Sequence, residues 1–216
     1  MTRDGAVHLP GAAAPFLVGL ESLLAGLPPD RAGIRLHGVT GLAARLAPEA
    51  LGSCAAQLLG PAARPVRAIL FDKSEAANWA LPWHQDRIIA VKARAEVPGF
   101  GPWSVKAGMQ HVEPPFALIG AMHTIRIHLD PVDAANAPLL VAPGSHRLGR
   151  IPEPEIETVA ARCGVLACLA ERGDIWVYAT PILHASAAAE PPARRRVLQV
   201  DYSAQALPAP LEWLGV

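Results

Sequence analysis

A histidine and a carboxylate two positions apart are the first residues in the sequence whose spacing could do chemistry. In the segment Trp83-His-Gln-Asp86, an extended chain would direct the side chains of His84 and Asp86 to the same face. An imidazole and a carboxylate placed in this way can share one cation. Because His-x-Asp is a common pair, it indicates a metal site only together with a third ligand.

His184 is the candidate third ligand, in a predicted strand whose following residues are small. Two histidines and one carboxylate on one face of an octahedron are the ligand set of non-haem Fe(II) oxygenases, and three positions of the metal then stay open. Strands that lie far apart in sequence can meet inside a double sheet. The same three side chains could also hold zinc, so a zinc-dependent hydrolase is an alternative.

Three consecutive arginines, residues 194–196, follow a predicted turn at 190–192. If the strands on either side of this turn form a hairpin, Ser186 pairs with Arg195 and His184 pairs with Val197. The guanidinium and the hydroxyl would then lie one pair from the metal ligand, on its side of the sheet. Because a guanidinium binds a carboxylate bidentately, this arrangement predicts an anchor for the far end of a dicarboxylate that chelates the metal.

The register of this hairpin decides which arginine is the anchor. A slip of one residue would select Arg194 or Arg196 instead of Arg195. The strand 195–202 also has two faces. Its apolar face contains Arg196, Leu198, Val200 and Tyr202, and its more polar face contains Arg195, Val197, Gln199 and Asp201.

The elements that must position these residues are mostly short strands. Turn residues separate predicted strands at 66–73, 84–93, 121–130, 139–142, 173–179, 182–187 and 195–202. Helical patterns occur at 16–27, from about 40 to 59, and at 153–163. Short strands at this spacing favour a sandwich or barrel, with the first helices packed outside an antiparallel double sheet.

Composition restricts the class of protein. The chain has 216 residues, 19 basic and 19 acidic side chains, and 51% hydrophobic residues. This balance argues against nucleic acid or an anionic membrane as a partner and favours one globular domain, residues 1–216. The apolar run 12–20 is too short to span a membrane. An odd number of cysteines, three, without CxxC spacing favours a reducing, cytoplasmic location.

Several segments resemble the phytanoyl-CoA dioxygenase family of Fe(II)- and 2-oxoglutarate-dependent oxygenases. They occur in order over nearly the whole chain: Asp4-Gly-Ala-Val-His-Leu-Pro-Gly11, Trp83-His-Gln-Asp86, Pro143-Gly-Ser-His146, His184-Ala-Ser186 and Arg195 through Tyr202. The resemblance implies a mainly β fold, a double-stranded β-helix of the jelly-roll or cupin-like type with N-terminal helices outside the sheets. Residues 1–64 would form a mostly helical flank, and residues 65–205 the jelly-roll core.

The same resemblance assigns roles to individual residues. It implies that His84, Asp86 and His184 hold Fe(II), and that Arg195, helped by Ser186, binds the C5 carboxylate of the cosubstrate 2-oxoglutarate. Gln85 is a further candidate contact of the cosubstrate. With O2, such an enzyme hydroxylates a small molecule and releases succinate and CO2. Related halogenases have a small residue at the position of Asp86, so its carboxylate favours hydroxylation.

The sequence leaves the substrate open. Arg126 occupies a position where some relatives have an aromatic neighbour of the cosubstrate; it could reach an anionic substrate or cosubstrate, or pair with Asp201. Trp103 and His111 lie in predicted loops that could form a substrate mouth, although the tryptophans could instead seal the rim of the core. A non-catalytic jelly-roll protein that binds a metabolite is a further alternative. The oligomeric state is not indicated.

Overall fold

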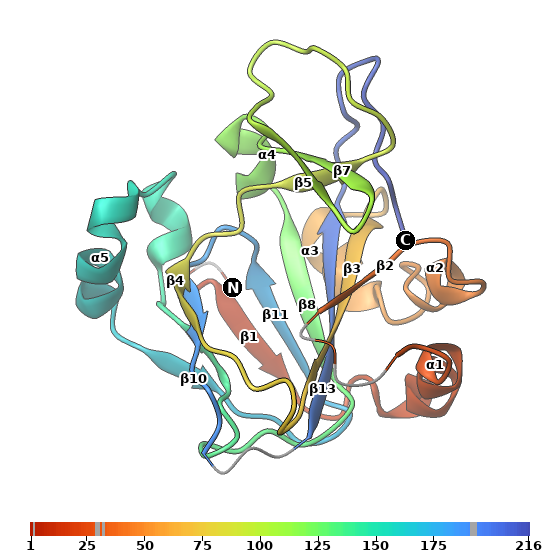
Figure 1. Ribbon diagram of the computed structural model, residues 1–216, viewed down its shortest axis with the longest axis vertical. Helices are drawn as coiled ribbons and strands as arrows, with labels where there is room; N and C mark the ends of the chain where they lie inside the picture. The colour runs from red at the N-terminus through yellow and green to blue at the C-terminus, as the bar shows by residue number, and fades with distance from the viewer. Residues whose placement is uncertain (2, 29–30, 32, 191–193) are drawn as a thin grey trace.

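The computed structural model of the chain describes residues 1, 3–28, 31, 33–190 and 194–216. Most of the predicted turn at 190–192 therefore lies outside the described residues. The fold is mainly β, and its strands form three antiparallel sheets (Figure 1). This confirms the predicted jelly-roll class.

The largest sheet has six strands and carries most of the core. Its order is β1 (Ala6–Leu9), β11 (Ile175–Ala179), β8 (His123–His128), β13 (Arg195–Ser203), β3 (Arg64–Lys73) and β2 (Ile34–Leu36). The long strands β3 and β13 pair along nearly their whole length. Side chains that are two residues apart on these strands therefore point to the same face of the sheet.

A second sheet faces the first, and a third lies at one end of the molecule. The second has the order β10 (Leu166–Cys168), β9 (Leu139–Val141), β12 (His184–Ser186) and β4 (Leu81–His84). The third has the order β5 (Ile89–Val91), β7 (Met109–Val112) and β6 (Trp103–Lys106). Figure 1 shows β5 and β7 above the end of the large sheet, close to the short helix α4 (Phe116–Gly120).

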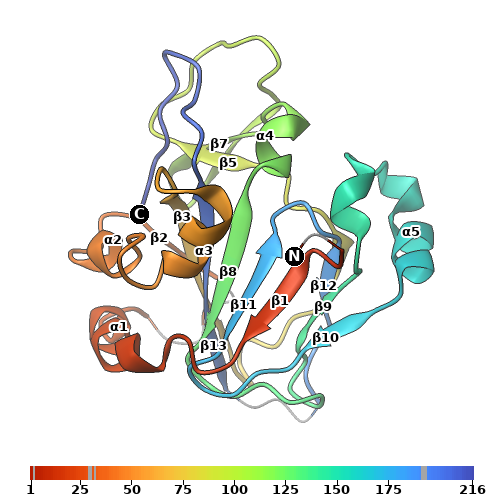
Figure 2. The ribbon, with the colours of Figure 1, turned by 180° about the vertical axis from the view of Figure 1, so that it is seen from behind.

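Three helices from the first part of the chain cover the outer face of the six-stranded sheet (Figure 2). They are α1 (Leu17–Leu24), α2 (Leu42–Arg45) and α3 (Ser53–Leu59), while α5 (Ile156–Cys163) lies outside the second sheet. Short 3-10 turns occur at Ala14–Phe16, Ser145–Leu148 and Glu153–Glu155. Within the described ranges, no helix has the length and apolar character needed to cross a membrane.

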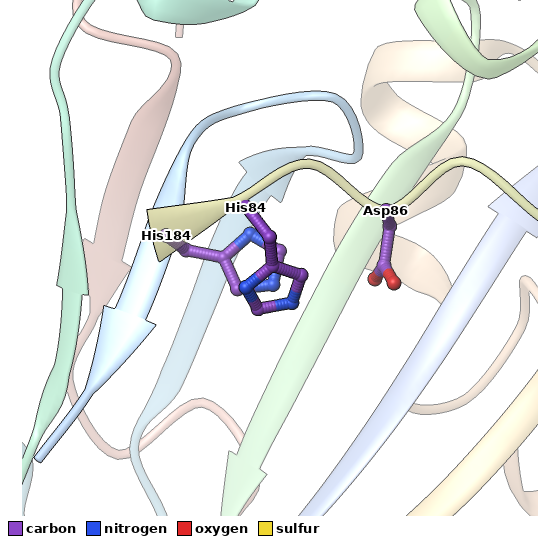
Figure 3. A group of neighbouring side chains, drawn as sticks. All are labelled: His84, Asp86 and His184. Carbon is purple, nitrogen blue, oxygen red and sulfur yellow. The ribbon is translucent and has the colours of Figure 1, made fainter. Parts of the chain in front are cut away.

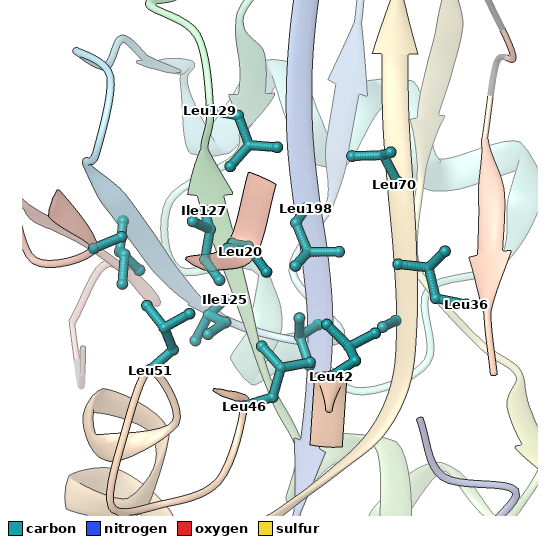
Figure 4. Close-up of a cluster of buried hydrophobic side chains, with 14 of the residues drawn as sticks. Leu20, Leu36, Leu42, Leu46, Leu51, Leu70, Ile125, Ile127, Leu129 and Leu198 are labelled. Atoms are coloured by element: carbon teal, nitrogen blue, oxygen red, sulfur yellow. The ribbon is translucent and has the colours of Figure 1, made fainter. Parts of the chain in front are cut away.

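The main core lies between these helices and the large sheet (Figure 4). Leu20, Leu42 and Leu46 from the helical segments pack against Ile127 and Leu198 from the strands, and none of the five is measurably exposed. Each such side chain contributes roughly 2 kcal/mol by leaving water. Because side chains alternate along a strand, the same strands turn their other residues toward the second sheet.

The prediction of two faces on the last strand is confirmed. Leu198, Val200 and Tyr202 of β13 pack in the core under the helices. Arg195 and Gln199 of β13 line a cavity between the two sheets. The alternation thus separates a packing face from a polar face on one strand.

The predicted hairpin between the strands of His184 and Arg195 is wrong. Strand β12 pairs with β4 and β9, whereas β13 pairs with β3 and β8, so the two strands belong to different sheets. Arg195 lies opposite Lys73 and not opposite Ser186. The alternation of side chains predicted their faces correctly, but it does not determine which strands pair.

Two other boundaries differ from the sequence prediction. The predicted strand 84–93 is two strands, β4 and β5, separated by an irregular segment that contains Asp86. Residues 1–64 hold helices in both predicted helical stretches, α1 in the first and α2 and α3 in the second, but also β1 and β2, which form both edges of the large sheet. Each of these edge strands has only three or four residues, too few for a clear alternation.

Candidate metal centre

His84 and His184 lie directly opposite each other on β4 and β12. Their ring centroids are 4.2 Å apart (Figure 3). The Nδ1 atom of each ring is 2.9 Å from the carbonyl oxygen two residues earlier, Pro82 for His84 and Ile182 for His184. A carbonyl only accepts, so each Nδ1 carries the hydrogen and each Nε2 keeps a lone pair. Both imidazoles are therefore fixed in the tautomer that can bind a metal.

Asp86 brings a carboxylate to the same place. It leaves the irregular segment after β4 and directs its oxygens to the side on which the two rings lie (Figure 3). One ligand atom from each of His84, Asp86 and His184 lies within 4.8 Å of the others. Burial, and next His84, lower the pKa of His184 to about 4, so this ring is neutral at pH 7. Two imidazoles and one carboxylate fit a divalent transition metal.

Arg67 holds the carboxylate of Asp86 in place. From β3, its Nη2 donates to Asp86 Oδ2 at 3.2 Å, while its Nε donates to Asp201 Oδ2 at 2.5 Å. Burial alone would raise the pKa of Asp86, but the charge of Arg67, together with smaller contributions from His184 and His84, lowers it overall. Burial raises the pKa of Asp201 in spite of its ion pair. Arg67 is a positioning residue that sequence reasoning missed.

Replacing Arg67 by methionine should cost about 3–5 kcal/mol of stability, because it leaves Asp201 and Asp86 buried without their cation. The same change should weaken metal binding by about 10–100-fold, as expected when an outer partner of a ligand is removed. Urea denaturation and a metal titration measure the two effects. Arg64→Met is the control, since Arg64 is exposed on the same strand. Equal stability of the two variants would contradict the bridging role.

A cavity of about 510 Å³ adjoins the three candidate ligands. It lies between the large sheet and the second sheet, and residues of β3, β8, β12 and β13 contribute to its wall. Arg195 and Ser186, the two predicted anchors of the cosubstrate, both line it. They reach it from facing sheets, so the predicted neighbourhood exists although the predicted strand pairing does not.

Arg195 is the arginine of the triplet that reaches this cavity. Its side chain is buried, and its Nη1 donates to the backbone carbonyl oxygens of Asn136 and Ala137. Arg194 instead pairs with Asp72 at 2.9 Å, and Arg196 pairs with Asp130 at 2.7 Å. Among the described residues, Arg195 has no carboxylate within ion-pairing distance. Its charge is therefore available to a ligand.

Lys73 adds a second cation beside Arg195. Its Nζ donates to Ser186 Oγ at 3.1 Å and to the carbonyl oxygens of Trp79 and Ala187 at 2.7 and 2.8 Å. Burial, with a further contribution from Arg195 and then Arg126, lowers the pKa of Lys73 to about 8. Lys73 thus fixes Ser186 and adds positive charge to this end of the cavity.

Arg126 lines the cavity but does not pair with Asp201. Its Nη1 donates to Gln199 Oε1 at 2.8 Å, and its guanidinium lies 5.3 Å from the centroid of Phe71. Arg67 takes the place of Arg126 as the partner of Asp201. The pairing alternative is therefore wrong, and Arg126 stays a candidate contact for an anion.

Of the other three predicted contacts of cosubstrate and substrate, Gln85 lines the cavity, whereas Trp103 and His111 do not. The Gln85 amide makes three hydrogen bonds to backbone groups of Gly149, Ile151 and Pro181, and its contact with the cosubstrate stays a prediction. Trp103 packs against the separate apolar cluster that contains Val112 and is not part of the cavity wall. His111 is fully buried on β7 and also lies outside the wall. For Trp103, the structure favours the alternative of sealing a core.

Fold and site together define a class: a jelly-roll protein with two histidines and an aspartate gathered at a cavity between its sheets. The family model described as "Phytanoyl-CoA dioxygenase (PhyH)" matches residues 42–197. This is most of the chain, and the chain belongs to the phytanoyl-CoA dioxygenase family. No curated protein matches it.

Solved structures have the same fold at low sequence identity. Apo EctD from S. alaskensis is 20% identical with a TM-score of 0.66, over 99% of this chain and 78% of that chain. The epimerase SnoN, in complex with Fe3+, alpha ketoglutarate and nogalamycin RO, is 19% identical with a TM-score of 0.63, over 94% and 80%. HygX from Streptomyces hygroscopicus, with nickel and 2-oxoglutarate bound, is 13% identical with a TM-score of 0.59, over 94% and 83%.

Proposed function

We propose that this chain is an Fe(II)- and 2-oxoglutarate-dependent dioxygenase that hydroxylates a small metabolite and releases succinate and CO2. One observation carries the proposal: the ligand atoms of His84, Asp86 and His184 lie within 4.8 Å of one another beside a cavity that also contains the buried Arg195. Family membership and the iron- or nickel-bound neighbours with 2-oxoglutarate or alpha ketoglutarate support it.

In this proposal each residue has a defined task. His84 and His184 offer Nε2 lone pairs, and Asp86 offers a carboxylate oxygen that Arg67 orients. When bound, the ferrous ion would supply the oxidative chemistry with O2 and 2-oxoglutarate. Arg195 binds the distal carboxylate of 2-oxoglutarate, and Ser186, held by Lys73, adds a hydroxyl.

Arg195 distinguishes this function from the two alternatives. A zinc hydrolase would need the three ligands but no buried guanidinium without a carboxylate partner. A non-catalytic metabolite binder would not need an intact ligand set. Burying an unpaired guanidinium is costly, so a bound anion is the natural reason for its place.

The test is spectroscopic and chemical. Anaerobic protein with Fe(II) and 2-oxoglutarate should develop a visible charge-transfer band, and it should consume 2-oxoglutarate when air is admitted. Succinate release that rises with candidate metabolites supports hydroxylation. A protein that binds Zn(II) but neither develops the band nor consumes 2-oxoglutarate contradicts the proposal.

Binding of 2-oxoglutarate should weaken as the pH rises from 7 to 9. Lys73, whose pKa is about 8, is charged at the lower pH and neutral at the higher, so the cavity loses one positive charge next to Arg195. Loss of one positive charge near the bound dicarboxylate lowers the binding free energy by about 1 kcal/mol, or about fivefold in Kd. Calorimetry on the Ni(II)-loaded protein measures it. Lys73→Met should give a shallower profile, to which Arg195 still contributes near pH 9 because burial and then Arg126 lower its pKa to about 9. An unchanged slope in this variant would contradict the assignment.

A further inference from the structure

The cavity wall carries far more positive than negative side chains. Asp86 is the carboxylate among its lining residues, against seven cations: Arg35, Arg67, Lys73, Arg87, Lys106, Arg126 and Arg195. Metal binding would add further positive charge at Asp86. Such an excess is unfavourable in the free protein and favours anionic ligands.

Most of these cations have partners within the protein. Arg67 pairs with Asp86 and Asp201, and Arg87 donates to the carbonyl oxygen of Ile151 and lies 3.6 Å from Glu153. Lys73 has its three acceptors and Arg126 has Gln199, as described above. Arg195 is assigned to 2-oxoglutarate.

Arg35 and Lys106 remain. In the described part of the chain neither forms an ion pair, and Nε of Arg35 is buried without a hydrogen-bond partner. Arg35 is the central residue of β2, whose neighbours Ile34 and Leu36 pack into the helical core, so its side chain is directed to the cavity face. Lys106 reaches the same cavity from the end of β6, in the third sheet.

The cations form two separate groups. Burial lowers the pKa of Arg35, and the charge of Arg67 lowers it further. Burial also lowers the pKa of Lys106, with further contributions from Arg35 and then Arg67. Asp86 opposes the shift in both groups. In contrast, burial and then Arg126 lower the pKa of Arg195, and burial, then Arg195 and Arg126, lower the pKa of Lys73. The strand register shows the same division, because on β3 Lys73 lies opposite Arg195, whereas Ile69, four residues earlier, lies opposite Arg35. One group is therefore centred on Arg195, and the other lies toward Arg67 and Asp86.

We propose that Arg35 and Lys106 form a second anion subsite, which binds an acidic group, a carboxylate or a phosphoryl group, of the primary substrate. This proposal rests on the proposed function, because it assigns the first subsite to 2-oxoglutarate. Two cations from different sheets, on the Asp86 side of the cavity, would hold the substrate by its charged end and direct the rest of it to the metal site.

The first experiment uses sulfate as the probe. Calorimetry measures sulfate binding to the protein loaded with Ni(II) and saturating 2-oxoglutarate, and also to the metal-free protein. Arg35→Gln and Lys106→Gln should each weaken sulfate binding about 10-fold, the effect of losing one charge-assisted hydrogen bond. Lys92→Gln is the matched control, since Lys92 is exposed, pairs with Glu212 and does not line the cavity.

The outcomes separate the two proposals. Absence of sulfate binding, equal binding by all variants, or competition between sulfate and 2-oxoglutarate overturns the second subsite. If 2-oxoglutarate fails to load but sulfate binding still depends on Arg35 and Lys106, the anion subsite is supported and the oxygenase function is overturned. Lys106 is exposed, so Lys106→Gln tests the site even where Arg35→Gln does not fold.

The second experiment tests the substrate class. Small carboxylic and phosphonic acids and the uncharged amides of the same carbon skeletons are compared for stimulation of succinate release. The acids should stimulate, and Lys106→Gln should raise their KM about 10-fold, whereas Lys92→Gln should leave their KM unchanged. Stimulation by the amides alone overturns the proposal, and the more active acid class identifies the acidic group.

Discussion

Replacing Asp86 by alanine should lower the affinity for Fe(II) or Ni(II) by more than about 100-fold and reduce 2-oxoglutarate consumption to background. Removing a residue that only hydrogen-bonds to a metal ligand already lowers metal affinity about 10–100-fold, and Asp86 is itself a candidate ligand. It is the one carboxylate of the predicted set, and Arg67 and Gln199 hold its Oδ2 at 3.2 and 3.5 Å. Calorimetry with Ni(II) and a succinate assay with Fe(II) measure the two effects.

The matched control for this change is Asp72→Asn. Asp72 is another buried carboxylate that pairs with an arginine, Arg194, but it does not line the cavity. It should therefore leave metal affinity and turnover unchanged. Turnover by Asp86→Ala at the wild-type rate, with normal metal affinity, would contradict the ligand role of this residue and with it the proposed function.

The candidate ligands could be predicted because they lie in short sequence motifs that occur in the same order as those of the family. His84 and Asp86 form a short motif, and His184 and Arg195 occur in order behind it. The structure brings the three candidate ligands together and gives Arg195 a place on the same cavity. Strand pairing was predicted incorrectly because β12 has three residues and its partners, β4 and β9, are distant in sequence.

Arg67 and Lys73 were missed although the sequence contains a signal for them. Arg67 interrupts the apolar run 65–71, and Lys73 lies six positions later in the same alternation, whereas Asp72 belongs to the other one. Together with Ile69 and Phe71 they line the cavity, whereas Ala68 and Leu70 pack under the helices. A charged residue inside an apolar run of a strand, such as Arg67, therefore indicates a polar cavity on the face to which its side chain points. Arg35 has no comparable signal, because β2 is only three residues long.

Replacing Arg195 by glutamine should raise the KM and Kd for 2-oxoglutarate by about 100-fold. A bidentate pair between a guanidinium and a carboxylate comprises two charge-assisted hydrogen bonds, each worth about 1.5–3 kcal/mol, and tenfold in affinity corresponds to about 1.4 kcal/mol. Arg195→Lys should recover only part of this loss, since an ammonium keeps the charge without the planar fork. Binding is measured by calorimetry on the Ni(II)-loaded protein.

Arg194→Gln is the control that makes this experiment specific. Arg194 is the adjacent arginine, its side chain is 57% exposed, and its partner is Asp72 outside the cavity. It should bind 2-oxoglutarate as the wild type does, and both variants should keep wild-type affinity for Ni(II), because neither residue is among the candidate ligands. A large loss with Arg194→Gln and none with Arg195→Gln would mean that the neighbouring arginine is the anchor. Equal and small effects would mean that the distal carboxylate has another partner, for which Arg126, another cation in the cavity wall, is a candidate.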